Sequence, residues 1–223
     1  MALTWLPWAS WILTASLALP LPSRAFDTPL SDSAVRDAYF IGQRHNETTA
    51  KFLDKYVKHL LPPKSGPYVS SVALYSPFAQ VVIASDLHIG HYSAQQAQID
   101  HRDRRETVVC VVEIQLTDSY PAFIPDPAHN RTNSHPNLVP RPYDFWADVQ
   151  VHFPNGDEEL RPFTSSGRPN VTCSDQGGGC LLTGATLQFE FEASAFPTNE
   201  ATVQIQPPEG DLLTVNFDLS SVR

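Results

Sequence analysis

The stretch Leu187-Gln-Phe-Glu-Phe-Glu192 alternates apolar and polar side chains at every position. Successive side chains of a β-strand point to opposite faces, so this pattern predicts a strand with one buried face and one wet face. Residues 145–153, 202–206 and 213–219 alternate in the same way. One-sided alternation is typical of antiparallel sheets, and several such strands favour a β-sandwich.

Further strands are predicted upstream of this region. Residues 68–75 and 78–84 are apolar runs separated by Pro77, and residues 107–117 are apolar on both faces until Glu113. The last run predicts a central strand that is covered on two sides. The segment Pro154-Asn-Gly-Asp157 predicts a hairpin turn, because Asn-Gly accepts the positive φ of a type I′ turn.

Helices are expected at the start of the mature chain. Val35, Ala38 and Gly42 are spaced for one helical face, and Asn46 is placed to cap a second helix whose apolar stripe continues to Leu60. Ser93 and Gln96 match a capping box, which predicts a short helix ending near residue 104.

The expected fold class is therefore α+β, with a helical hairpin in residues 26–66 packed on an antiparallel β-sandwich. The alternative is a single curved antiparallel sheet or open barrel. Residues 26–223 are expected to form a single domain, with residues 67–223 mostly antiparallel β. A loop at residues 120–144 holds six prolines and has no periodicity, which is typical of functional or disordered segments.

The first 25 residues predict a signal peptide. Residues 5–21 are apolar and uncharged, and Ser23-Arg-Ala25 places small residues where signal peptidase cuts. We therefore expect a mature chain from Phe26 that is secreted or periplasmic and has no membrane span after cleavage. An uncleaved anchor is the alternative, although the run is short for a span of about 20 residues.

The net charge bears on the partners of the protein, and the cysteines bear on the compartment in which it folds. The formal net charge of −9 disfavours nucleic acid as a partner, because an acidic surface repels phosphate. Cys173 and Cys180 flank a Gly-rich loop, so in an oxidising compartment we expect a disulfide between them. Cys110 lies in a run of valines, which predicts a buried and unreactive thiol.

Two groups of side chains are candidate sites. Asp86, His88, His91 and His101 offer imidazole and carboxylate ligands for a divalent metal, although His-x-x-His alone equally suits an exposed polar loop. The other group is aromatic and is made up of Trp146, Tyr143 and His152. A tryptophan on a polar strand face can stack on a sugar ring or anchor a protein partner, unless the helical hairpin covers it.

Asp37-Ala-Tyr-Phe-Ile-Gly-Gln-Arg44, Pro67-Tyr-Val69 and Tyr92-Ser-Ala-Gln-Gln-Ala97 carry a resemblance. The chain resembles uncharacterised secreted bacterial hypothetical proteins with no assigned activity. The resemblance covers about the first half of the mature chain. It implies secretion and transfers no site residue.

These observations predict a secreted, non-enzymatic β-rich domain that binds a protein or a glycan outside the cytoplasm and needs no cofactor. The sequence favours such a protein over an enzyme, because it lacks the Gly-x-Ser-x-Gly, Walker and Gly-x-Gly-x-x-Gly motifs. The alternative function is a metal-dependent secreted hydrolase that uses the His/Asp cluster.

Overall fold

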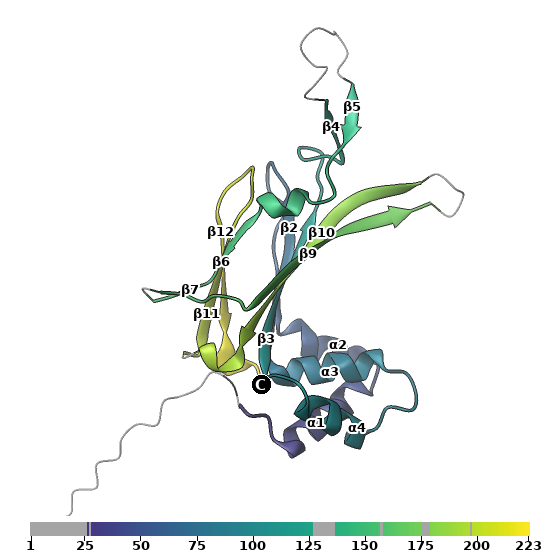
Figure 1. Cartoon of the computed structure of the whole chain (residues 1–223), viewed down its shortest axis with the longest axis vertical. Helices are drawn as coiled ribbons and strands as arrows, with labels where there is room; N and C mark the ends of the chain where they lie inside the picture. The colour runs from purple at the N-terminus through teal and green to yellow at the C-terminus, as the bar shows by residue number, and fades with distance from the viewer. Residues whose placement is uncertain (1–25, 27, 127–136, 157, 175–178, 197) are drawn as a thin grey trace, which may run out of the picture.

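The computed structural model describes residues 26, 28–126, 137–156, 158–174, 179–196 and 198–223. The predicted signal peptide lies outside the described residues. Within these residues, four α-helices and mostly antiparallel sheets form an α+β fold (Figure 1). None of the described helices is long and apolar enough to cross a membrane.

The largest sheet has the strand order β1-β2-β3-β10-β9, and every pair in it is antiparallel. Its strands are β1 (Val57–His59), β2 (Tyr68–Tyr75), β3 (Thr107–Gln115), β9 (Thr164–Cys173) and β10 (Cys180–Glu192). β3 lies at the centre, as predicted. One face of β3 is buried, and the residues that point to its other face are half-buried or exposed. The prediction that both faces of this strand are fully covered is therefore wrong.

A second sheet has the order β12-β11-β6. Its strands are β6 (Gln150–His152), β11 (Glu200–Gln206) and β12 (Leu213–Asp218). Val72, Val112 and Leu187 of the first sheet and Val203 and Val215 of the second belong to one buried apolar cluster. The two sheets therefore share one core, and neither sheet closes on itself.

The helices gather at one end of the five-stranded sheet (Figure 1). They are α1 (Asp32–Gly42), α2 (Glu47–Asp54), α3 (Pro77–Leu87) and α4 (Ala94–Arg102). A separate apolar cluster, which includes Val35, Phe78 and Ala97, holds them together. α1 packs closely on α3 at Gly42, because a Cβ there would lie 2.6 Å from Cβ of Ser85.

The predicted strand at residues 78–84 is wrong, because these residues lie within α3. Ser76 caps this helix by accepting a hydrogen bond from the backbone N–H of Ala79 at 3.2 Å. Pro77 occupies the first turn, where a missing N–H costs no helical hydrogen bond. The apolar run of α3 is buried and has no helical period, so periodicity alone could not separate helix from strand.

The second predicted helix is shorter than expected. Asn46 caps it as predicted, but α2 ends at Asp54, and the apolar stripe continues as strand β1. β1 pairs with β2 at the edge of the sheet, and this pairing gives its backbone groups partners on one side. Tyr56, between α2 and β1, is buried, and its hydroxyl donates to the backbone carbonyl of Arg223 at 2.9 Å. The hydroxyl of Ser76 donates to the same carbonyl.

The structure of residues 120–159 differs in part from the expectation. Residues 145–148 form a 3₁₀ helix, η1 (Phe145–Asp148), and only β6 after it is strand. The Pro-rich loop contains the two-stranded hairpin of β4 (Phe123–Pro125) and β5 (Leu138–Pro140), and its residues 127–136 lie outside the described residues. The predicted hairpin is confirmed by the pairing of β7 (Pro154–Asn155) with β8 (Glu158–Glu159), but Asn155 pairs with Glu158, so the turn begins at Gly156 and not at Asn155 as the Asn-Gly prediction has it.

The remaining elements are two short 3₁₀ helices, η2 (Ala193–Ala195) and η3 (Leu219–Ser221). The predicted disulfide is present: the sulfurs of Cys173 and Cys180 are 2.00 Å apart near the end of the β9–β10 hairpin. Cys110 is free and buried, also as predicted. Burial raises the pKa of its thiol far above the ordinary value, so the thiol is chemically inert in the folded protein.

Candidate functional site

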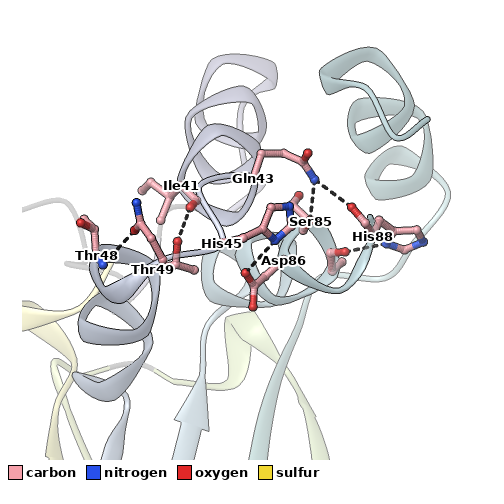
Figure 2. A network of polar contacts seen from close by, with 10 residues as sticks. Ile41, Gln43, His45, Thr48, Thr49, Ser85, Asp86 and His88 are labelled. Carbon is pink, nitrogen blue, oxygen red and sulfur yellow. Dashed lines mark hydrogen bonds and ion pairs between the residues drawn. The ribbon is translucent and has the colours of Figure 1, made fainter. Parts of the chain in front are cut away.

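Asp86 and His88, two of the predicted metal ligands, lie at the end of α3 with different partners. The carboxylate of Asp86 is 3.2 Å from Nδ1 of His45, in the turn before α2 (Figure 2). The ring of His88 is within hydrogen-bond distance of the Ala84 carbonyl and stacks on Tyr92, with ring centroids 4.4 Å apart. Figure 2 shows the imidazoles of His45 and His88 on opposite sides of the α3 terminus.

The other two predicted ligands lie elsewhere. His91 is exposed in the loop before α4. His101 lies in α4, and its Nε2 is 3.0 Å from Oε1 of Glu106, with side chains only 13% and 19% exposed. Among the described residues, no group of three or more His, Cys, Asp or Glu is arranged to hold a metal ion. The metal-dependent hydrolase stays a prediction, and these contacts do not favour it.

Sequence reasoning missed His45 and Glu106, the partners of these side chains. Asp86 and His45 are 41 residues apart in the chain. Glu106 follows His101 by 5 residues, but its pairing depends on the turn between α4 and β3. Neither pair shows a spacing that a sequence motif could have detected.

The three aromatic-site residues are not gathered in one place. Trp146 is half-buried in η1 and lines a hollow of about 290 Å³ with Ser165, Leu187 and Phe189. The indole packs on Gly167, where a Cβ would lie 2.6 Å from its Cζ3 atom. Gly167 pairs with Leu187, whose side chain is in the core, so Trp146 lies on the core side of the sheet.

Tyr143 and His152 do not line this hollow. Tyr143 is 56% exposed. His152 instead has its Nδ1 atom 2.9 Å from Oε1 of Glu159, in the neighbouring strand β8. That hydrogen bond from His152 lowers the pKa of the Glu159 carboxyl below its ordinary value.

The opposite face of the five-stranded sheet carries a row of polar side chains that crosses all five strands. The strand register places its members directly opposite one another in the order His59, Ser71, Glu113, Thr186, Arg168. We call these five residues the polar row. Directly opposed residues share one face of a sheet. Adjacent positions such as Val112 and Leu187 point into the core, so the polar row points away from it.

Glu113 is the centre of the polar row and is held by two neighbours. Oγ1 of Thr186 lies 3.1 and 2.9 Å from the two carboxylate oxygens, and Nδ2 of Asn170 lies 3.3 Å from one of them. Thr186 is only 7% exposed, whereas Glu113 is half-buried. Because bonds to a carboxylate are stronger than neutral ones, these contacts fix the position of the carboxylate.

A hollow of about 630 Å³ lies over this part of the sheet, and its lining includes His59, Ser71, Glu113 and Asn170. A hollow of this size is within the range of small-molecule binding sites. The nearby phenol of Tyr75 has a raised pKa, first because it is buried and second because the Glu113 carboxylate disfavours its anion. The Glu113 charge therefore also affects the pKa of Tyr75, which is not one of its hydrogen-bond partners.

One feature of the sequence indicates the polar row: Glu113 is an acidic residue in the otherwise apolar strand predicted at residues 107–117. Its two partners lie 57 and 73 residues further along the chain. Only the pairing of β3 with β10 and of β10 with β9 brings them together. No protein-family model matches the chain, and no curated protein matches it.

Proposed function

We propose that this chain is an exported, non-enzymatic domain that binds a protein or a glycan outside the cytoplasm. The apolar, uncharged segment at residues 5–21 supports export. The disulfide between Cys173 and Cys180 is compatible with an oxidising compartment. We further infer that the two sheets are the layers of a β-sandwich, with α1 and α2 as a helical hairpin against its end.

The observation that carries the proposed function is the polar row with its hollow. It presents a fixed carboxylate, hydroxyls, an imidazole and a guanidinium on one sheet face, away from the core. Polar groups held in place on rigid strands bind a ligand without a large loss of conformational freedom.

The predicted aromatic site is a second location for the same function. Trp146 lines a hollow on the other face of the sheet, and Ser165 and Leu187 line the same hollow beside it. Tyr143 and His152 do not line the hollow, so this second location rests on Trp146 alone. A ligand there would stack on the indole.

The test is retention of the intact protein on envelope fractions and on glycan arrays. Three proteins are compared: the unchanged chain, Glu113→Gln and Trp146→Ala. Binding by the unchanged chain that one substitution weakens supports the function and locates the site on one face. Equal and negligible retention of all three proteins would remove the proposal.

A further inference from the structure

We infer that the polar row is a binding site for a neutral, extended oligosaccharide, with Glu113 accepting hydrogen bonds from sugar hydroxyls. This inference rests on the proposed binding function and names its ligand class. It commits to the sheet face that carries Glu113 and not to the face that carries Trp146.

The hydrogen-bonding capacity of Glu113 is the first reason. An ionised carboxylate only accepts hydrogen bonds and has about four lone-pair sites. Thr186 and Asn170 occupy part of this capacity from the β9–β10 side of the sheet. The hollow lies over Glu113 and Ser71 on the β2 side as well. Adjacent hydroxyls of a sugar ring are the donors that a carboxylate at this position takes up.

The length and charge of the polar row are the second reason. Five strands at about 4.8 Å spacing give a row of about 19 Å, which suits an extended ligand of several units. His59, whose Nε2 atom is 3.1 Å from Oδ1 of Asp54, and Arg168 lie at its two ends, with the carboxylate of Glu113 between them. A phosphate or sulfate group over the centre would be repelled by Glu113, and a cationic group at the β9 end would be repelled by Arg168, so we infer an uncharged ligand.

The adjacent cross-strand row is the third reason, because it is apolar over β1, β2 and β3 before it continues through Gln188 and Ser166 on β10 and β9. Val57, Ala73 and Val111 lie directly opposite one another, one row closer to the helices. Val57 and Val111 are half-buried, so they leave apolar surface beside the polar side chains. A sugar ring has hydroxyls at its edge and C–H groups on its faces, and it matches a polar row beside an apolar one. An extended peptide would bind through backbone groups at a strand edge instead.

The test is calorimetric titration of the full chain with cello-, malto- and chito-oligosaccharides. The Glu113→Gln variant keeps the size of the side chain and a partner for Thr186 but removes the charge. We expect it to weaken binding by about tenfold or more, as for lost hydrogen bonds to a charged group. Glu200→Gln, on β11 of the other sheet, is the matched control and should bind like the unchanged chain.

Arg168→Ala is a second variant, because Arg168 is exposed and its loss should leave the fold intact. It should also weaken binding if the ligand spans the row. Oligosaccharide binding that neither Glu113→Gln nor Arg168→Ala weakens would overturn the assignment of the site. Retention on envelope proteins without binding to any oligosaccharide would overturn the ligand class but leave the proposed function standing. If neither an oligosaccharide nor any envelope component is bound, both are wrong.

Discussion

The indole of Trp146 rests on the backbone of Gly167 in the edge strand β9. A Cβ built at Gly167 would lie 2.6 Å from Cζ3 of that ring, closer than non-bonded atoms approach. The position of Trp146 therefore depends on the absence of a side chain on the neighbouring strand.

We expect Gly167→Ala to destabilise the protein by about 1–3 kcal/mol, because the added methyl group displaces the indole. Once residues 1–25 are removed, Trp146 is the single tryptophan, so its fluorescence reports on this site alone. Urea unfolding and the fluorescence maximum are the measurements. In a Trp146→Leu background most of the cost should disappear, and an equal cost in both backgrounds would contradict the contact.

The Glu113 carboxylate should contribute, after burial, to the raised pKa of Tyr75. Burial and the Glu113 charge raise the Tyr75 pKa, so Glu113→Gln should lower it towards its ordinary value of about 10. A raised tyrosine pKa stabilises the fold fully below the unfolded pKa, and this stability is lost as pH rises through the folded pKa. NMR titration of labelled tyrosine checks the shift. An unchanged Tyr75 pKa would show that the two groups do not interact.

The states of the three cysteines predict how many thiols per chain react with a thiol reagent. Oxidised protein should react with a thiol reagent very slowly when folded, because Cys110 is buried and its pKa is raised. After denaturation without reductant, a single thiol per chain should appear, because Cys173 and Cys180 are bridged. Three thiols at that stage would exclude the disulfide.

The metal content of the protein separates the two predicted functions. Because His88, His101 and Asp86 have different partners, we expect protein purified without chelator to hold far less than stoichiometric metal. Elemental analysis measures this, and His88→Ala should leave the value unchanged. Stoichiometric zinc that His88→Ala removes would favour the hydrolase instead.

The hydroxyl of Tyr56 should add to stability through its bonds to Arg223. The Tyr56 hydroxyl donates to the Arg223 carbonyl and accepts from the Arg223 backbone N–H, so Tyr56→Phe removes two hydrogen bonds, and we expect the free energy of unfolding to fall by about 0.5–1.5 kcal/mol for each. Tyr68→Phe is the comparison variant. It also removes a tyrosine hydroxyl, one that donates a hydrogen bond to the backbone carbonyl of Leu60 in a half-buried site. A Tyr56→Phe protein as stable as the unchanged chain would show that water replaces the bonds at no cost.

The parts of the fold that the sequence predicted are those in which local chemistry and tertiary packing agree. Ser93 caps α4, and Gly156 forms its turn, because each interaction is complete within a few residues. Two segments were assigned wrongly for a different reason. Val57 continues a helical stripe but joins a sheet through its pairing with Ala73, 16 residues away. Phe78 begins an apolar run that fits either a buried strand or a buried helix.

The candidate site was largely beyond sequence reasoning. Glu113 stands out in the sequence as an acid in an apolar strand. Its contacts with Thr186 and Asn170 could not be predicted, because they depend on the strand order β3-β10-β9. The histidines appeared clustered because they are close in sequence. His88 and His101 nevertheless bond different neighbours, because α4 and the loop before it separate them.

The bond between Tyr56 and Arg223 joins positions 167 residues apart. This contact therefore cannot form until the chain from Tyr56 to Arg223 has been synthesised. Chains with many such distant contacts fold slowly. For the export proposed above, a contact that forms this late would suit passage of an unfolded chain through a translocon.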